Sequence, residues 1–339
     1  MLAFGLAFFA CLLVIRIANK YAIYDKPTSI KIHKKVVTFL GSVAILVGFF
    51  IPVVFAATKF HIGNVLLYEL ALLFLISIYG VYDDFVILNS YRKLIFFVVV
   101  SFILCLIVEN PEAIKYQNLN FRNLASMVSR VVIYCIVINA FNLIDGADGV
   151  LATISIVSVM AYISIFSQLH LIFETLAGLT LIGCLFAYLI FNFTPASIFM
   201  GDGGSLFIGL YFAICTHNIL SLSNSAFPFG EGDDLLLIKS ASIVALPIFD
   251  LFRVFIIRIY RRANPLKGDR NHIHHLFQRI GFSCKQVIVA VLLIHIVFIS
   301  IAFVNVFHTL YGYILFISSL YALITIIIAE LEAKLNFSK

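Results

Sequence analysis

Five aspartates lie in three short segments, each of which follows a long apolar run. They are Asp83 and Asp84 in Tyr-Asp-Asp-Phe (82–85), Asp145 and Asp148 in Asn-Ala-Phe-Asn-Leu-Ile-Asp-Gly-Ala-Asp-Gly (139–149), and Asp202 in Phe-Met-Gly-Asp-Gly-Gly-Ser (199–205). Carboxylates that gather beside an apolar phase repel one another unless a cation lies among them. Oxygen ligands of this kind suit Mg²⁺ or Mn²⁺, which also bind phosphate oxygens. Taken together, the segments predict a divalent-cation site.

Each segment taken alone has a simpler explanation. Asp202 precedes Gly203-Gly204-Ser205 and could act as the N-cap of a following helix, while Asp145 and Asp148 lie beside glycines and could form a tight polar turn. Asn139 and Asn142 are one helical turn apart and share a helix face. Each asparagine could form a hydrogen bond between helices or, because carboxylates are nearby, could supply a neutral oxygen ligand to a metal.

A basic segment at 258–285 contains a dense histidine motif. His272, His274 and His275 fall within four positions, two residues after Arg270. A zinc site would need further Cys or His partners, which the sequence does not offer. Attraction to anionic lipid headgroups explains most of the basic residues but not the histidines. Side chains of this type suit the phosphate oxygens of a diphosphate or a nucleotide, and together with a bound cation they point to phosphoryl transfer.

The composition identifies the elements that must position these residues. Of 339 residues, 63% are hydrophobic and 12% are charged, whereas a soluble domain carries about 25% charged residues. A soluble enzyme, a disordered chain and a fibrous repeat are therefore excluded, and long apolar runs favour helices over a β-barrel. We expect an all-α polytopic membrane protein, a single domain over 1–339. Its eleven predicted spans are 1–19, 36–57, 62–80, 93–109, 127–143, 149–167, 170–191, 205–221, 235–258, 286–306 and 309–331.

Basic residues predict the orientation of these spans. With the N-terminus outside and the C-terminus cytoplasmic, sixteen of the 23 Lys and Arg residues fall in inner segments, as the positive-inside tendency requires. The aspartate segments and the 258–285 loop then share the cytoplasmic face. Asp250 and Arg253 follow Pro247 inside the ninth span at a spacing of three. They form either an intramembrane ion pair or part of a nucleotide pocket.

Four motifs in the same order resemble the polyprenyl-phosphate N-acetylhexosamine-1-phosphate transferases (glycosyltransferase family 4, MraY/WecA-like). They are the three aspartate segments and His-Ile-His-His at 272–275. The form of the histidine motif resembles the branch that takes UDP-N-acetylglucosamine (WecA/TagO). The branch that takes UDP-N-acetylmuramoyl-pentapeptide is the alternative. One departure is Thr38-Phe39-Leu40-Gly41-Ser42, where the family has Pro-x-x-Gly-Gly.

The resemblance implies an enzyme of the bacterial cytoplasmic (inner) membrane. It would transfer an N-acetylhexosamine 1-phosphate, foremost that of N-acetylglucosamine, from a UDP-sugar to undecaprenyl phosphate and release UMP. The lipid product would prime cell-surface polysaccharide synthesis. The expected cofactor is Mg²⁺, with Mn²⁺ as an alternative, and membrane lipid is a further partner. No nucleic acid is expected, and a homodimer is left open. The rival class is an ion-coupled transporter, which would place its carboxylates near the bilayer midplane.

The resemblance also implies roles for individual residues. The metal ligands would be Asp202 and Asn142. The catalytic group would comprise Asp83 and Asp84, which handle the lipid phosphate, and Asp145 and Asp148, which orient the nucleotide-sugar and the metal. The substrate-binding residues would be Lys93, Asn139, Arg270, His272, His274 and His275. For Lys93, an ordinary lysine at the membrane edge is the alternative.

Overall fold

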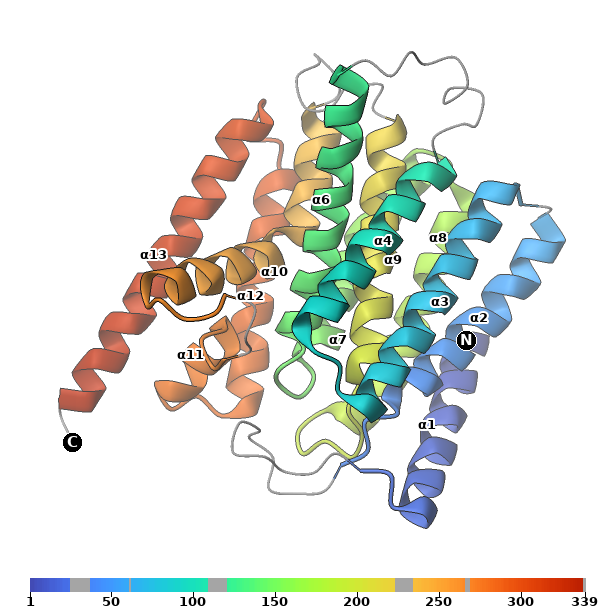
Figure 1. The fold of residues 1–339 in the computed structure, drawn as a ribbon, viewed down its shortest axis with the longest axis horizontal. Coiled ribbons are helices and arrows are strands. Elements are labelled where there is room, and N and C mark those ends of the chain that lie inside the picture. Colours follow the sequence, from blue (N-terminus) through green and yellow to red (C-terminus); the bar gives the residue numbers. More distant parts are fainter. Residues whose placement is uncertain (25–36, 61, 109–120, 223–233, 266–268, 338–339) are drawn as a thin grey trace.

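The structure is a computed structural model that describes residues 1–24, 37–60, 62–108, 121–222, 234–265 and 269–337 (Figure 1). The described residues form twelve helices. These are α1 (Leu2–Tyr21), α2 (Gly41–Phe60), α3 (Asn64–Val86), α4 (Ser90–Val108), α6 (Phe121–Ile144), α7 (Val150–Gln168), α8 (Ile172–Asn192), α9 (Gly201–Leu222), α10 (Asp234–Tyr260), α11 (Ile273–Arg279), α12 (Cys284–Phe303) and α13 (Leu310–Phe337).

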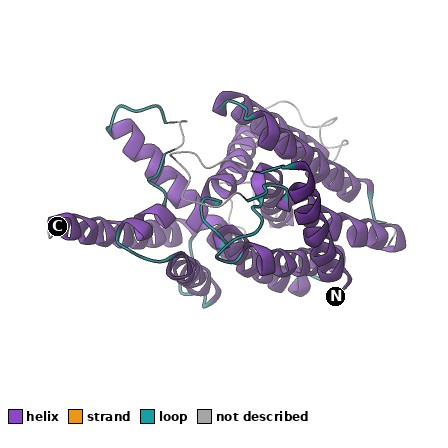
Figure 2. Ribbon diagram, turned by 90° about the horizontal axis from the view of Figure 1, so that it is seen from below, coloured by secondary structure: helices purple, strands orange, loops and turns teal. Residues whose placement is uncertain are grey.

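The predicted all-α fold with eleven membrane spans is confirmed. Eleven of the helices are long and apolar enough to cross a membrane, and α11 is a single short helix of seven residues. Within the described residues there are helices and loops but no strand (Figure 2), apart from one isolated bridge between Thr38 and Ile198. Long apolar segments take this form because a helix satisfies all its backbone hydrogen bonds internally.

Several helices begin or end beyond the predicted limits. Helix α3 continues to Val86 rather than ending at residue 80, and α9 begins at Gly201 rather than at residue 205. Hydropathy marks where side chains become polar, whereas a helix continues as long as its backbone hydrogen bonds continue. Asp83 and Asp84 therefore lie in the last turn of α3, and Asp202 lies in the first turn of α9. The end of the bundle that carries these three residues is called the aspartate end below.

Helix α9 runs through the middle of the bundle (Figure 1) and is its most enclosed span, with 89% of its apolar stretch buried. It packs most extensively against α3. Gly80 makes this contact close, because a Cβ atom there would lie 2.5 Å from the backbone oxygen of Asp202. The absence of a side chain at Gly80 thus brings Asp83 and Asp84 beside the start of α9.

The segment before α2 fixes the other side of the α9 start. The N–H of Gly41 donates to the carbonyl of Phe199 at 2.9 Å, and the N–H of Phe199 donates to the carbonyl of Thr38 at 2.7 Å. This segment holds the position where the family has Pro-x-x-Gly-Gly. The residues of this segment still form backbone hydrogen bonds with Phe199 and Met200, which lead into Asp202. On the other side of the molecule, α13 lies away from α1, and the two termini are on opposite sides (Figure 2).

Candidate active site

Lys93 joins two of the predicted aspartates. Its ammonium group, in the first turn of α4, lies 2.6 Å from Oδ2 of Asp202 and also forms an ion pair with Asp83. The Asp83 side chain is 1% exposed, and its Oδ1 accepts a hydrogen bond of 2.7 Å from the N–H of Leu88. A buried carboxylate requires such partners because loss of water penalises its charge. Lys93 thus belongs to the cluster formed with Asp83 and Asp202 and is not an isolated lysine at the membrane edge.

Asp84 caps the first turn of α9. Its Oδ1 accepts a hydrogen bond of 2.7 Å from the N–H of Asp202, and its Oδ2 accepts one of 3.2 Å from the N–H of Gly203. The first N–H groups of a helix have no partner within it, and the helix dipole there favours a negative charge. The alternative that Asp202 caps its own helix is therefore wrong, since a carboxylate of another helix receives these N–H groups.

Asn142 connects α6 to the same point. Its Nδ2 donates to Oδ1 of Asp202 and to Oγ of Ser205, both at 2.9 Å. Asn139 lies one turn earlier on α6 and is half-buried. Among the described residues it makes no hydrogen bond with the aspartates. The structure therefore brings the predicted metal ligands Asp202 and Asn142 into contact and leaves Asn139 beside them without a direct bond.

Asp145 and Asp148 lie in the loop between α6 and α7. Asp148 is buried, and its Oδ2 accepts a hydrogen bond of 3.4 Å from the N–H of Ala196. Burial, and then the negative charges of Asp202, Asp84 and Asp148, together raise the pKa of Asp145 to about 8. This shift means that the loop carboxylates and the helix-end carboxylates are close enough to repel one another.

A metal ion could balance the crowded negative charges of these aspartates. Lys93 forms ion pairs with two of these aspartates, Asp83 and Asp202. Within the same ranges, no three His, Cys, Asp or Glu side chains form a preassembled metal site. The donors nevertheless fit a hard cation such as Mg²⁺, because carboxylate and amide oxygens are its preferred ligands. A half-turn of the Asn142 amide would present its oxygen to an ion held by Asp202.

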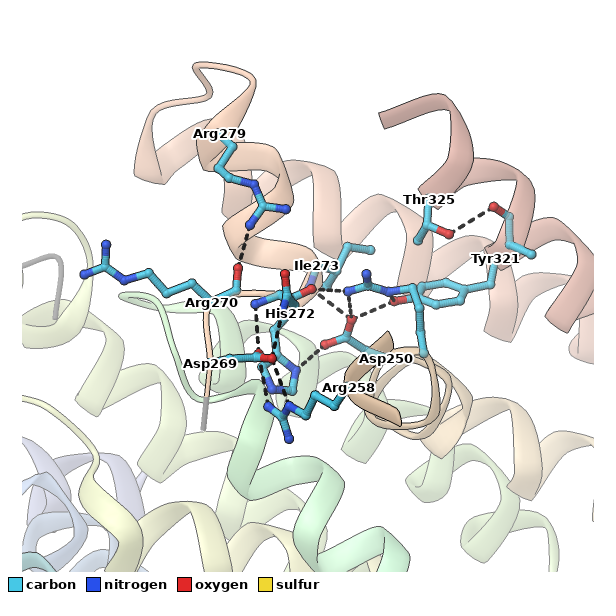
Figure 3. Close-up of polar contacts among 12 residues, drawn as sticks. Asp250, Arg258, Asp269, Arg270, His272, Ile273, Arg279, Tyr321 and Thr325 are labelled. Carbon is cyan, nitrogen blue, oxygen red and sulfur yellow. Dashed lines mark hydrogen bonds and ion pairs between the residues drawn. The ribbon is translucent and has the colours of Figure 1, made fainter. Parts of the chain in front are cut away.

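Asp250 anchors the histidine motif to α10 (Figure 3). Its Oδ2 accepts from Nδ1 of His272 at 2.7 Å, and its Oδ1 accepts from Arg253 and the Tyr321 hydroxyl, both at 2.8 Å, and from the N–H of Ile273 at 3.0 Å. Asp250 is 1% exposed. Of the two alternatives for Asp250 and Arg253, the ion pair is present. Its hydrogen bond to His272 also fixes the position of that ring.

A second anchor was not predicted from the sequence. Arg258, at the end of α10, donates to both carboxylate oxygens of Asp269, at 2.9 and 3.0 Å (Figure 3). Partial burial opposes ionisation of Asp269, but hydrogen bonds from Arg258 and Asn271 lower its pKa to about 2. The two residues are eleven positions apart with no periodic pattern between them, so no local signal could have paired them. Residues 266–268 of this loop lie outside the described residues.

His274 brings the histidine motif to the aspartates. Its ring is buried and packs on Gly146, where a Cβ atom would lie 2.2 Å from Nε2 of His274. Gly146 directly follows Asp145 in the loop between α6 and α7. The histidine motif and the aspartate segment 139–149 therefore touch at this position. Burial, and then the charges of His275 and His272, keep the pKa of His274 well below its usual value. His274 is therefore a neutral imidazole near neutral pH.

His275 and Arg270 complete the set of predicted substrate-binding residues. His275 is half-buried, and its Nδ1 forms a hydrogen bond of 3.1 Å with Gln278. Burial lowers its pKa, so that it too is mainly neutral. The side chain of Arg270 extends away from the Asp250 cluster (Figure 3), while its carbonyl accepts a hydrogen bond of 2.6 Å from Arg279. Arg270 therefore supplies a cationic side chain at the surface of the loop.

Asn192 is a further residue that the sequence analysis did not single out. Its Oδ1 accepts a hydrogen bond of 2.7 Å from the N–H of Gly149, and its Nδ2 donates to the carbonyl of Ile198 at 2.8 Å. It thereby ties the Asp148 loop to the segment that leads into Asp202. The only sequence signal for Asn192 was that a polar residue ends an apolar helix. Polar residues are common at helix ends, so this signal did not distinguish it.

Asp83, Asp84 and Asp202 lie in the first or last turns of their helices, and Asp145 and Asp148 lie in a loop, whereas a transporter would place such carboxylates in the helix middles. The fold and the site thus define a polytopic membrane protein with a polar, carboxylate-rich and histidine-rich site at one end of its helix bundle. This is the arrangement of a membrane enzyme that acts on a substrate with a polar headgroup.

Comparisons with known proteins agree with this class. Residues 66–219 match the family model of glycosyl transferase family 4. The chain is 29% identical over 332 residues to a probable undecaprenyl-phosphate N-acetylglucosaminyl 1-phosphate transferase of Bacillus subtilis, covering 96% of this chain and 88% of the relative. It is 25% identical to undecaprenyl-phosphate alpha-N-acetylglucosaminyl 1-phosphate transferases of Yersinia pestis and Escherichia coli K12, covering 82% of this chain and 75% of each relative.

The comparisons confirm the family predicted from the four motifs. The protein is a membrane transferase, and residues 66–219 are the part that is similar to glycosyl transferase family 4. That range includes all five predicted aspartates, Lys93 and both asparagines, whereas the histidine motif lies beyond it.

Proposed function

We propose that the protein transfers N-acetylglucosamine 1-phosphate from UDP-N-acetylglucosamine to undecaprenyl phosphate, and that it requires Mg²⁺. The substrates are those named for relatives that match 82–96% of this chain. The observation that carries the proposal is the junction at Asp202, where α3, α4, α6 and α9 meet through Asp84, Lys93 and Asn142. Such a junction suits a cation bound together with phosphate groups. A reaction between a diphosphate donor and a phosphate acceptor requires both.

In the proposed reaction an oxygen of the lipid phosphate attacks the β-phosphorus of the UDP-sugar. A new P–O bond forms there, the P–O bond from the β-phosphorus to the bridging oxygen breaks, and UMP leaves with that oxygen. The attacking oxygen is already ionised at neutral pH, so no strong base is required. Bound Mg²⁺ would offset the charge of the diphosphate.

The chain's own residues have distinct tasks in this proposal. Lys93 neutralises phosphate charge, and Asp83 holds its ammonium group in place. Asp84 fixes the backbone that carries Asp202. Asp145 and Asp148, with the neutral His274 against Gly146, form the wall that orients the sugar nucleotide. Arg270 offers a cation to its diphosphate.

The proposal includes an orientation. With the N-terminus outside, the aspartate end faces the cytoplasm, which is the side where a UDP-sugar is available. The positive-inside distribution of Lys and Arg supports this orientation, and the bacterial relatives support the inner membrane as its location.

The experiment is a UMP-release assay on the purified protein with undecaprenyl phosphate and UDP-N-acetylglucosamine, with Mg²⁺ or with a chelator. We expect UMP release only when both substrates and Mg²⁺ are present. Asp202→Asn should abolish it without loss of folding. Glu330→Gln, which removes an exposed carboxylate of α13, is the matched control and should retain activity.

Two results would contradict the proposal. One is activity of Asp202→Asn close to that of the wild-type protein. The other is UMP release that does not depend on the lipid acceptor. Assays with UDP-N-acetylgalactosamine, with UDP-N-acetylmuramoyl-pentapeptide and with Mn²⁺ in place of Mg²⁺ test the choice of sugar and metal in the same format.

A further inference from the structure

A cluster of buried polar side chains connects the histidine motif to the last membrane-spanning helix. Tyr321 lies on α13, outside the range 66–219 that matches the family model. Its hydroxyl donates to Oδ1 of Asp250 at 2.8 Å and accepts from Nε of Arg253 at 3.4 Å. Figure 3 shows Asp250 between Tyr321 on one side and His272 on the other. Helix α13 thus reaches the histidine motif through Asp250.

The partners of Asp250 determine which nitrogen of His272 carries hydrogen. Oδ1 of Asp250 accepts from the Arg253 guanidinium, the Tyr321 hydroxyl and the N–H of Ile273. A carboxyl group that is surrounded by donors and paired with a guanidinium is ionised, and an ionised carboxylate can only accept. Nδ1 of His272, which lies 2.7 Å from Oδ2, therefore donates the hydrogen of that bond.

The other ring nitrogen, Nε2, is the atom that His272 has left for a ligand. The hydrogen bond at one nitrogen of an imidazole fixes what the other nitrogen offers. Because Nδ1 faces Asp250, Nε2 faces away from it. The ring of His272 lies parallel to that of His274, with centroids 5.9 Å apart, and His274 packs on Gly146 beside Asp145. His272 is therefore next to the wall assigned above to the sugar nucleotide.

We infer that Asp250 and Tyr321 are positioning residues, which hold His272 so that its Nε2 binds the diphosphate of the sugar nucleotide. This inference rests on the proposed function. A carboxylate bonded to Nδ1 fixes the tautomer and orientation of an imidazole and stabilises a positive charge on it. Such an imidazolium donates a charge-assisted hydrogen bond to a phosphate oxygen. Tyr321 acts through Asp250, to which its hydroxyl is bonded.

The inference makes the last span part of the substrate-binding unit. A second contact supports this role, because Arg279 of α11 forms an ion pair of 2.8 Å with Glu332 of α13. Asp250 and Tyr321 are both buried, so water cannot readily replace the Tyr321 hydroxyl when it is removed. Asp250 then loses one of the donors that hold its carboxylate in place, and the ring of His272 loses its fixed orientation.

The test measures KM and kcat for UDP-N-acetylglucosamine in the UMP-release assay, and Kd for UDP by calorimetry, on the purified full-length protein. Tyr321→Phe should raise KM and Kd by about 10-fold, the effect of one hydrogen bond to a charged group, with kcat nearly unchanged. Tyr313→Phe is the matched control. Tyr313 is another buried tyrosine of α13, and its hydroxyl donates to the carbonyl of Phe298 at 3.0 Å. This variant should lower Tm as Tyr321→Phe does but keep KM and Kd.

A double-variant comparison tests whether Asp250 acts through the ring. Asp250→Asn and His272→Ala should each raise KM, and the two together should raise it no further than His272→Ala alone. If Asp250→Asn does not fold, Tyr321→Phe takes its place in the comparison. A purely structural role would instead give effects that multiply.

Three results would overturn the inference. The first is a fall in Tm of Tyr321→Phe with no change in KM or Kd. The second is a multiplied effect on KM in the double variant. The third is a failure of UDP to bind the wild-type protein. If the wild-type protein binds UDP but releases no UMP, the proposed function fails by itself, and the ratios of Kd among the variants still decide the role of Asp250 and Tyr321.

Discussion

A methyl group at position 146 tests the contact between the histidine motif and the aspartate loop. In Gly146→Ala the new Cβ would lie 2.2 Å from Nε2 and 2.6 Å from Cε1 of His274. An ordinary contact begins at 3.4 Å, so the ring must move by about 1.2 Å. The backbone of Gly146 lies outside the left-handed region, so alanine strains this contact and not the backbone.

The buried ring has little freedom to give way. His274 is 1% exposed and stacks on His272, with ring centroids 5.9 Å apart and an interplanar angle of 5°. Overpacking of this kind costs about 1–3 kcal/mol of unfolding free energy. A displacement of about 1 Å in a substrate-positioning group lowers kcat/KM by about 10²-fold. We therefore expect a large loss of activity with a moderate loss of stability.

The assay compares kcat, KM for the UDP-sugar and Tm of Gly146→Ala with those of Gly5→Ala. A Cβ at Gly5 would meet no atom within 4 Å, so Gly5→Ala is a matched control with the same chemical change. The reasoning is refuted if Gly146→Ala keeps the activity and Tm of the control. It is also refuted if Tm falls but kcat/KM of the folded fraction is unchanged, because His274 would then have no positioning role.

Three further predictions follow from individual contacts. Lys93→Met should lower kcat/KM by about 10²-fold or more in the UMP-release assay, because Asp202 and buried Asp83 lose their cation; Lys93→Arg should recover part of the loss. Asp84→Ala should lower the unfolding free energy by about 1–3 kcal/mol, and an unchanged Tm would rule out its capping role. The lowered pKa of Asp269 adds stability that is complete above about pH 4 and is lost as the pH falls towards about 2; circular dichroism of the wild-type protein should show this loss, and Asp269→Asn should lack that component.

Hydropathy and motif order were sufficient to predict the helical membrane fold and the family. A membrane forces each apolar run of this length into a helix, so the eleven spans could be counted without knowing their packing. The same count placed the aspartates of three distant segments at one end of the bundle. Only the exact helix limits were shifted, as in α3, which extends past Asp84.

The roles of individual side chains could not be predicted in this way. No sequence pattern assigned a partner to Asp83 or to Asp84, yet one pairs with Lys93 and the other caps α9. Adjacent residues of a helix point about 100° apart, and their partners depend on which helices pack around them.

The sequence by itself determined which chemical groups are present and at which end of the membrane-spanning bundle they lie, because apolar length and polar breaks are local properties of the chain. Only the tertiary structure decided that Lys93 lies between Asp83 and Asp202 and that His274 packs on Gly146. The Lys93–Asp202 and His274–Gly146 contacts join segments more than a hundred residues apart in sequence. Their contacts depend on the rotation and close approach of packed helices, which no local pattern encodes.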